Sequence, residues 1–137
     1  MNCWLLKSDP DDYSFDDLLR DGTTRWDGVS NPQALIHLRT IARGDRLLIY
    51  HTGAGKAVVG LASVSKGPYT DPAGDDARRV VIDIKAGQRL PRPVLLAQVK
   101  GDPRFADFPL VRMPRLSVMP VPGPIWNALL ELAGVAK

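Results

Sequence analysis

The sequence predicts an α+β domain, a small β-barrel of about five strands with helices packed around it. Three observations lead to this class. The chain has 137 residues, which is the size of one ordinary domain. Short runs that are apolar or alternate with polar residues recur along it, bounded by Gly, Pro and Asp, as is typical of strands. Strands and helices do not alternate in the βαβ order of a parallel sheet. We therefore expect residues 1–137 to form a single domain.

Each expected strand has the continuous or alternating apolar pattern of a chain packed on one or both faces. The expected strands are 2–7, 46–51, 57–65, 79–85 and 115–121. Residues 23–30, which carry Trp26 and Gly28, are expected to form a loop. Residues 67–76 are also expected to be a loop, because prolines and glycines interrupt them. Pro91 and Pro93 are expected to flank a turn. Residues 94–100 fit either a strand or a short helix, and residues 105–112 are irregular or a short helical turn.

Three helices are predicted from their end signals. Ser14 is placed as an N-cap before two aspartates, and Gly22 ends that helix. Asn31 followed by Pro32 is a strong start for a second helix. A third is expected over 124–132, with Trp126 facing inward.

The charge is unevenly distributed along the chain. Lys and Arg number 18 and Asp and Glu number 15, which gives a net charge of +3. Residues 1–30 hold 3 basic and 7 acidic residues, a net of −4, and the rest of the chain carries +7. Residues 85–116 alone carry +5. Such a segment can face phosphates; alternatively, the acidic and basic segments neutralise each other in the fold.

Several classes of function are disfavoured. One cysteine, Cys3, excludes an internal disulfide framework and a cysteine-built zinc site, and two histidines are too few for a histidine-rich metal site. We expect no metal and no cofactor. No apolar run approaches the ~18 residues of a membrane span, so we expect a cytoplasmic protein without a membrane partner. The segment 53–56 has the wrong spacing for a phosphate loop, and the paired carboxylates suit caps and solvated turns. We therefore expect no catalytic residue.

Two features suggest a binding site. Trp26 lies in a polar segment, where it either plugs the end of the core or offers a stacking platform for a flat ligand. Asn31 nearby has both donors and an acceptor for a base edge. His51 follows Tyr50 at a strand end before a glycine-rich turn, and is either a hydrogen-bonded structural residue or part of a pocket.

Six segments together resemble the EVE domain, a member of the PUA-like superfamily, in the family's order and over nearly the whole chain. The matching segments are Trp4 to Pro10, Tyr13-Ser14 with Asp17-Leu18, Trp26 to Ala34, Gly44-Asp45-Arg46 with Tyr50-His51-Thr52, Gly60-Leu61-Ala62 with Tyr69 and Asp71-Pro72, and Arg115 to Val121 with Trp126. Each is weak alone, and the six together are specific. The chain departs from the family at Ser30, where Arg is usual, and at Leu35 and Ile36, where Arg and Asn are usual.

The resemblance implies a PUA-like bent β-barrel of about five to six strands that binds DNA or RNA. It implies that a modified base of the cytosine type, such as 5-methylcytosine, is flipped from the stack into an aromatic pocket and read there. The implied pocket residues are Lys7, Ser8, Trp26, Asn31, Tyr50, His51, Leu116 and Ser117. Arg112 and Arg115 would form a phosphate-binding rim.

Two other functions remain open at this stage. Related PUA-like domains include amidohydrolases that act on modified nucleosides, and Lys7 would serve as the amine there if burial lowered its pKa. The third hypothesis is a protein-interaction module whose aromatic residues are only core. The sequence does not predict the oligomeric state.

Overall fold

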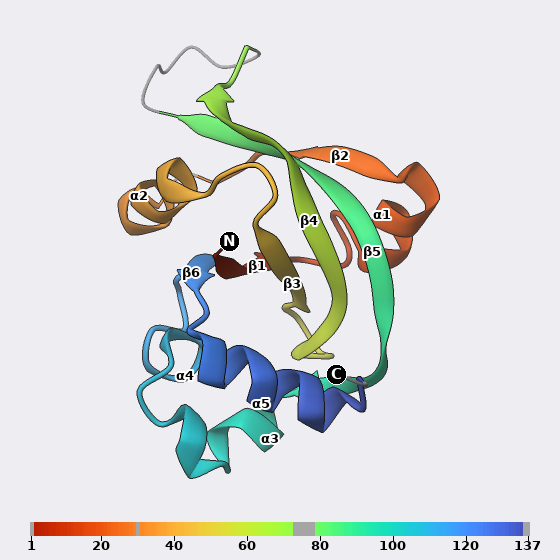
Figure 1. The fold of residues 1–137 in the computed structure, drawn as a ribbon, viewed down its shortest axis with the longest axis vertical. Helices are drawn as coiled ribbons and strands as arrows, with labels where there is room; N and C mark the ends of the chain where they lie inside the picture. The colour runs from red at the N-terminus through yellow and green to blue at the C-terminus, as the bar shows by residue number, and fades with distance from the viewer. Residues whose placement is uncertain (1, 30, 73–78, 136–137) are drawn as a thin grey trace.

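A computed structural model describes residues 2–29, 31–72 and 79–135. In it, six strands form one bent mixed sheet that is surrounded by helices (Figure 1). The strands are β1 (Cys3–Ser8), β2 (Thr23–Trp26), β3 (Arg46–His51), β4 (Ala57–Thr70), β5 (Val80–Leu95) and β6 (Val118–Pro120). The helices are α1 (Phe15–Asp21), α2 (Pro32–Thr40), α3 (Leu96–Lys100), the 3₁₀ turn η1 (Pro103–Phe105), α4 (Pro109–Arg112) and α5 (Gly123–Ala133).

The sheet runs in the order β2-β5-β4-β3-β1-β6. β1 and β3 pair in parallel, with Lys7 opposite Tyr50 and Ser8 opposite His51. The other pairs along the sheet are antiparallel. The α+β class is confirmed, with one difference from a closed barrel: in the described part of the chain, β2 and β6 stay at the two edges of the sheet. This arrangement brings the ends of β1 and β3 together.

The predicted helix starts are confirmed by their hydrogen bonds. The Ser14 hydroxyl accepts from the Asp17 N–H at 3.1 Å, and the Asp17 carboxylate accepts from the Ser14 N–H at 2.9 Å. The Asn31 Oδ1 accepts from the Ala34 N–H at 3.1 Å, and Pro32 takes the first helical position. Each cap satisfies a backbone donor that has no partner within its helix.

Two expected loops are wrong in part, at residues 23–26 and 67–70, because sheet pairing overrides local composition. Residues 23–26, expected in a loop, form the edge strand β2, since Trp26 pairs with Ile82 of β5 and buries its ring. β4 continues to Thr70 through a stretch expected to be irregular, because β5 pairs with it as far as Val80. Residues 73–76 of that expected loop lie outside the described residues.

The prolines at 91 and 93 do not make the expected turn. They lie within β5, which continues to Leu95 and pairs there with Ala57. β2 covers β5 only from Ile82 to Lys85, so the later part of β5 is an edge, where a missing N–H costs little. The ambiguous stretch 94–100 ends β5 and then forms α3, while most of the expected strand 115–121 is irregular outside β6.

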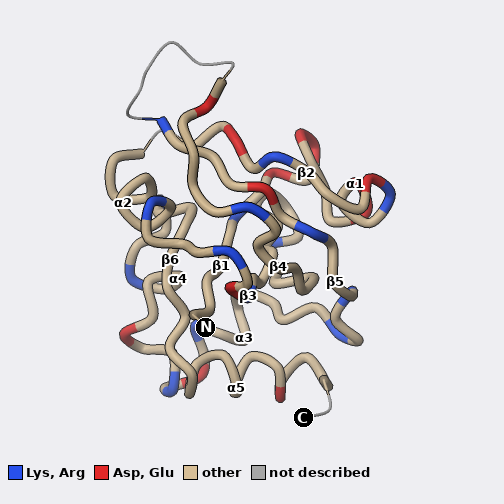
Figure 2. The backbone as a smooth tube through the Cα atoms, turned by 45° about the horizontal axis from the view of Figure 1, so that its top comes forward, with Lys and Arg blue, Asp and Glu red and all other residues tan. Residues whose placement is uncertain are grey.

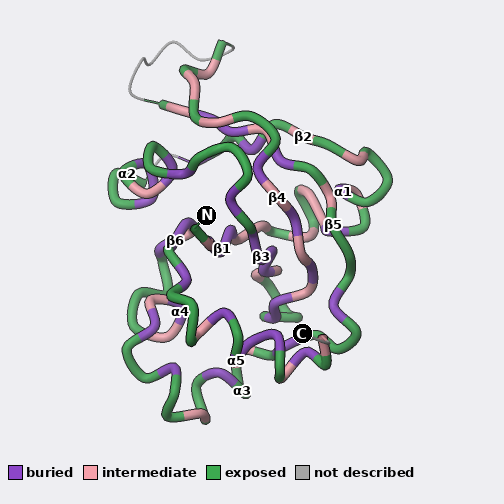
Figure 3. Tube along the Cα trace, viewed as in Figure 1, coloured by how far each residue is buried: buried purple, intermediate pink, exposed green. Residues whose placement is uncertain are grey.

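The core lies between the sheet and the helices that cover it. Buried positions concentrate on β1, β3, β4 and on α5 (Figure 3). Phe15 at the start of α1 is fully buried, and so are Leu5, Leu6 and Leu48 on the strands beside the site. No helix in the described ranges is long and apolar enough to cross a membrane.

Charged residues of both signs are interspersed over the strands (Figure 2). Arg89 of the basic segment forms an ion pair with Asp16 of the acidic one. Arg104 pairs with Asp102 at 2.7 Å and Arg112 with Asp107 at 3.2 Å, both within the basic segment. Part of the uneven charge of the sequence is therefore neutralised within the fold.

Candidate functional site

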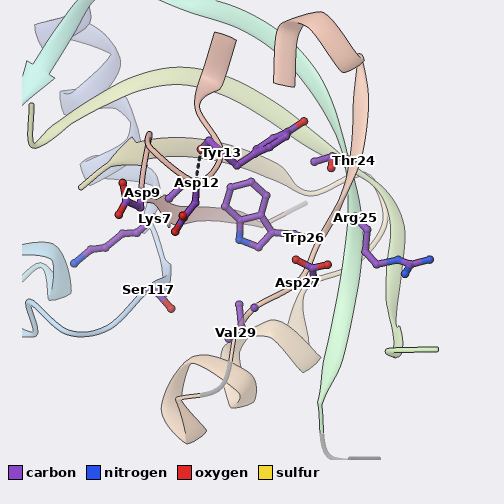
Figure 4. A pocket seen from close by; sticks show the side chains of 12 residues that line it. Lys7, Asp9, Asp12, Tyr13, Thr24, Arg25, Trp26, Asp27, Val29 and Ser117 are labelled. Atoms are coloured by element: carbon purple, nitrogen blue, oxygen red, sulfur yellow. Dashed lines mark hydrogen bonds between the residues drawn. The ribbon is translucent and has the colours of Figure 1, made fainter. Parts of the chain in front are cut away.

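A polar pocket of about 510 Å³ opens where the end of β1, the end of β2 and the segment before β6 meet (Figure 4). Its lining residues are Lys7, Ser8, Asp9, Asp12, Tyr13, Thr24, Arg25, Trp26, Asp27, Gly28, Val29 and Ser117. The volume falls within the ~300–1,000 Å³ that is common for small-molecule sites.

The end of β1 holds the pocket together. The backbone N–H of Lys7 donates to the Ser117 carbonyl at 2.9 Å, and the Lys7 ammonium donates to the Pro114 carbonyl at 2.9 Å. The Ser8 hydroxyl donates to the Tyr13 carbonyl at 2.5 Å. Two adjacent residues of one strand therefore fix both the turn before α1 and the segment before β6.

Aromatic rings supply the apolar part of the lining. Trp26 is the last residue of β2, and Figure 4 shows its indole pointing from the strand toward Asp12 and Lys7. The Trp26 side chain is only 8% exposed, so most of the ring packs into the core and a small part faces the cavity. Tyr13 is half-buried, and its hydroxyl donates to Asp21 at 2.8 Å. The pocket thus has a fixed apolar wall beside polar groups.

The charged groups of the lining have both signs. Asp9, Asp12 and Asp27 supply carboxylates and Lys7 supplies an ammonium, while Arg25 adjoins the lining with its guanidinium directed away from Trp26 (Figure 4). Burial lowers the pKa of the Lys7 ammonium. A flat polar molecule in this cavity would meet acceptors and donors together, as hydrogen bonding to a base edge requires.

Four of the predicted site residues meet in the pocket: Lys7, Ser8, Trp26 and Ser117. Three of the others lie behind or beside its walls. Tyr50 is 3% exposed and lies under Lys7, whose ammonium is 5.6 Å from the centre of the ring. Leu116 is buried next to Ser117. Asn31 uses its side chain to cap α2.

His51 and the two predicted rim arginines also lie outside the lining. The His51 Nε2 accepts a hydrogen bond from the Phe15 N–H at 2.9 Å, and burial lowers the pKa of this imidazole. Arg112 pairs with Asp107 at 3.2 Å. Arg115 is exposed two positions before Ser117.

The prediction omitted lining residues that adjoin the chosen ones in sequence. They are Asp9, Asp12, Tyr13, Thr24, Arg25, Asp27, Gly28 and Val29. The contiguity of Asp27, Gly28 and Val29 with Trp26 was an available signal. Asp12 and Tyr13 reach the site through a turn, in which the Asp9 carbonyl accepts hydrogen bonds from both of their N–H groups at 3.0 and 2.9 Å. No spacing pattern in the sequence indicates this turn.

The described residues contain no group of three or more His, Cys, Asp or Glu side chains arranged to hold a metal ion. The carboxylates of Asp9, Asp12 and Asp27 are hydrogen-bond acceptors.

Comparisons with known proteins agree with this architecture. The family model described as EVE domain matches residues 2–132. Mouse thymocyte nuclear protein 1 is 27% identical over 166 aligned positions, which cover 96% of this chain and 73% of that protein. A crystal structure of the Agrobacterium tumefaciens protein Atu2648 superposes with a TM-score of 0.96 at 34% identity and covers 100% of this chain and 96% of its own. The human THYN1 protein, solved in complex with DNA that contains 5-methylcytosine, gives a TM-score of 0.89 at 25% identity, with 100% of both chains covered.

Proposed function

Because this chain belongs to the EVE domain family, we propose that it binds nucleic acid and reads a modified cytosine base in the pocket of Lys7, Ser8, Trp26 and Ser117. The observation that carries the proposal is this pocket, in which an indole face, carboxylates and an ammonium line one cavity. The human relative crystallised with 5-methylcytosine DNA shares the fold over the full chain, which supports DNA as the partner. RNA is the alternative partner, and the experiment below includes it.

The chemistry of the lining suits cytosine. Its base-pairing edge presents an amino donor at N4 beside acceptors, and aspartate is a typical acceptor for that amino group. Asp12 and Asp27 provide such acceptors, and Lys7 provides a donor. Thymine and uracil present a carbonyl in place of the amino group, so a carboxylate would repel them. A methyl group on the base would meet Trp26, Tyr13 or Val29.

Base flipping explains how a paired nucleotide would reach this pocket. Extrusion costs a few kcal/mol, and hydrogen bonds and stacking inside the pocket must offset this cost. Tyr50, His51, Asn31 and Leu116 contribute from behind the walls in this proposal, by supporting the residues that touch the base. Arg115 remains a proposed phosphate contact at the rim together with Arg112. A cytoplasmic location also stays a prediction.

The test compares fluorescent duplexes that differ only in one 5-methylcytosine, together with RNA of the same sequence. We expect tighter binding of the methylated duplex. Trp26→Ala should weaken that binding by about ten- to a hundredfold, because base stacking contributes ~1–3 kcal/mol. Equal affinity for the modified and unmodified duplexes, unchanged in Trp26→Ala, would contradict the proposal.

Trp26 is largely buried, so a second variant guards against simple unfolding. Ser117→Phe places a ring at the pocket mouth and keeps the backbone carbonyl that Lys7 needs. It should abolish the methyl preference while the thermal midpoint stays near that of the parent. Asn127→Phe adds the same ring at an exposed position of α5 and should bind as the parent does.

One observation favours a second candidate, an amidohydrolase acting on an acylated nucleoside. Burial lowers the pKa of Lys7, and Ser8 and Asp12 share its pocket, so an amine with reduced proton affinity lies beside a hydroxyl and a carboxylate. Incubation with N4-acetylcytidine, followed by chromatography, tests it. Release of cytidine that Lys7→Met abolishes would support this candidate. The third hypothesis, an aromatic cluster that is only core, conflicts with the contact of Trp26 with the cavity.

A further inference from the structure

β2 has two faces with different chemistry. Thr24 and Trp26 stand opposite Ile84 and Ile82 of β5, and this face is directed toward the core and the base pocket. Thr23 and Arg25 stand opposite Lys85 and Asp83. Directly opposed residues on antiparallel strands project to the same side of the sheet, so these four form a polar outer face.

A second hollow of about 400 Å³ lies on this outer face, lined by Thr23, Thr24, Arg25, Ser65 and Asp83. Thr24 and Arg25 line both this hollow and the base pocket. β2 is the edge strand of the sheet, so only the width of one strand separates the two cavities. A ligand that fills one cavity can continue over β2 into the other.

Arg25 is held in place on the outer face. Its Nε donates to the Tyr69 hydroxyl at 3.3 Å, and that hydroxyl donates to the Asp83 Oδ1 at 2.6 Å. The Lys66 ammonium lies 4.2 Å from the centre of the Tyr69 ring. Figure 4 shows the Arg25 guanidinium directed away from Trp26. Its two terminal nitrogens make no hydrogen bond to the residues that the structure describes.

The charges of this face favour an anion over a cation. Arg25, Lys66 and Lys85 are basic, against Asp71 and Asp83, and Asp83 is already bonded to Tyr69. Figure 2 shows basic and acidic positions interleaved along these strands. A guanidinium with free terminal nitrogens binds phosphate through two parallel bonds, and threonine and serine hydroxyls are common phosphate contacts.

We propose that a nucleic-acid strand crosses the edge strand β2, with its base in the pocket on one face and a flanking phosphate bound by Arg25 on the other. Tyr69 is the positioning residue, since its hydroxyl fixes the Arg25 side chain before the phosphate arrives. The inference rests on the proposed function and adds a backbone contact at a place different from the Arg112 and Arg115 rim.

The experiment measures the dissociation constant for methylated and unmodified duplexes across a salt series. Each phosphate contact adds about 0.9 to the slope of log affinity against log salt. Arg25→Gln should make the slope shallower by about that amount on both duplexes. When the salt rises from 50 to 200 mM, the factor by which affinity falls should therefore be about 3.5 times smaller for this variant than for the parent. Arg25→Lys keeps the positive charge and should therefore have the same salt slope as the parent. Arg104→Gln, which removes one charge far away on η1, should leave the slope unchanged.

The positioning role of Tyr69 is tested by combining its substitution with that of Arg25. Tyr69→Phe should weaken binding in the parent but cause no further loss in Arg25→Gln, because it acts only through Arg25. Thermal midpoints measured alongside separate this coupling from a loss of fold. Additive effects of the two substitutions would overturn the positioning role.

The outcomes separate the two proposals. An unchanged slope in Arg25→Gln would overturn the phosphate contact, even if the methyl preference remains. A reduced slope without any methyl preference in the parent would support the phosphate contact and contradict the base-reading function. Absence of binding to any duplex or RNA would overturn both.

Discussion

The backbone N–H of Phe15 donates a hydrogen bond to the Nε2 of His51 across 2.9 Å, between residues 36 positions apart. The bond joins the first turn of α1 to the end of β3. It therefore also holds the preceding turn, in which Asp12 and Tyr13 line the base pocket. The acceptor role requires an Nε2 without a proton, so the contact depends on the charge of the imidazole.

This contact predicts a loss of stability in mild acid. Burial lowers the pKa of His51 below its ordinary value of 6.5, so the unfolded chain binds a proton more readily than the folded one. The contribution is complete above pH 6.5 and is lost as the pH falls through the window below that value. His51→Gln, whose amide oxygen can still accept from Phe15, should show a flatter free energy of unfolding between about pH 7 and 5 in urea titrations.

His37 provides the control for this prediction. Burial lowers its pKa as well, so His37→Gln removes that separate contribution and should leave the His51 part intact. A pH profile that His51→Gln leaves unchanged would contradict the proposed role of the bond.

A second prediction concerns Asp45, which is 4% exposed. Its carboxylate accepts from Trp4 Nε1 at 2.9 Å, from the Ala42 N–H at 2.9 Å and from the Asn2 N–H at 3.1 Å. Burial acts to raise the pKa of Asp45, but the three donors outweigh it and lower the pKa. Asp45→Asn keeps the shape and turns one acceptor into a donor, so it should cost about 1–3 kcal/mol.

Asp45→Ala leaves all three donors without an acceptor and should cost more than Asp45→Asn in chemical denaturation. Trp4→Phe removes one donor and should lessen the difference between the two Asp45 variants. Equal stability of both Asp45 variants and the parent would show that these three hydrogen bonds to the carboxylate do not stabilise the fold.

A third prediction concerns Gly60 in β4, at a break in its register with both neighbouring strands. A Cβ at this position would overlap the Phe15 ring, which is fully buried. Gly60→Ala should therefore destabilise the protein by about 1–3 kcal/mol, the usual cost of overpacking. Gly67→Ala in the same strand meets only the Arg43 nitrogen at 3.7 Å and should be neutral or slightly stabilising.

Thermal unfolding of Gly60→Ala together with Phe15→Leu gives the decisive comparison. If the clash is the cause, the double variant should be more stable than the sum of the two single effects. Simple additivity would place the cost of Gly60→Ala elsewhere.

The sequence predicted those parts of the fold that local chemistry determines. Ser14 and Asn31 are N-caps because their side chains bond donors three positions ahead, and the strand 46–51 has a continuous apolar run. β2 could not be predicted, since its four residues include only one buried side chain and its pairing with β5 comes from a segment almost 60 positions away. The extension of β5 past Pro91 likewise depends on an edge that only tertiary structure creates.

The site followed the same division. Lys7, Ser8, Trp26 and Ser117 could be chosen together because the resemblance placed them in recognisable segments. Asn31 and His51 were chosen for their polar side chains, but those side chains satisfy backbone N–H groups at the starts of α2 and α1. Helix starts always present such donors, and sequence alone does not show which polar side chain will meet them.

The fourth prediction addresses which base the pocket accepts. If Asp12 or Asp27 accepts from the cytosine amino group, replacing that carboxylate by an amide that can turn either way should weaken discrimination against a base with a carbonyl there. Discrimination by one well-formed base contact amounts to about 1–3 kcal/mol.

Competition between duplexes that carry 5-methylcytosine or thymine opposite the same guanine measures this discrimination, because both bases have the methyl group. Asp27→Asn and Asp12→Asn should each be measured, with Glu131→Gln, which removes an exposed carboxylate on α5 outside the pocket lining, as the control. The carboxylate that reads the amino group is identified by a selective loss of preference for 5-methylcytosine at constant stability. If both variants keep the parent's preference, the base is read by other groups of the lining, with Lys7 and Ser117 the next to replace.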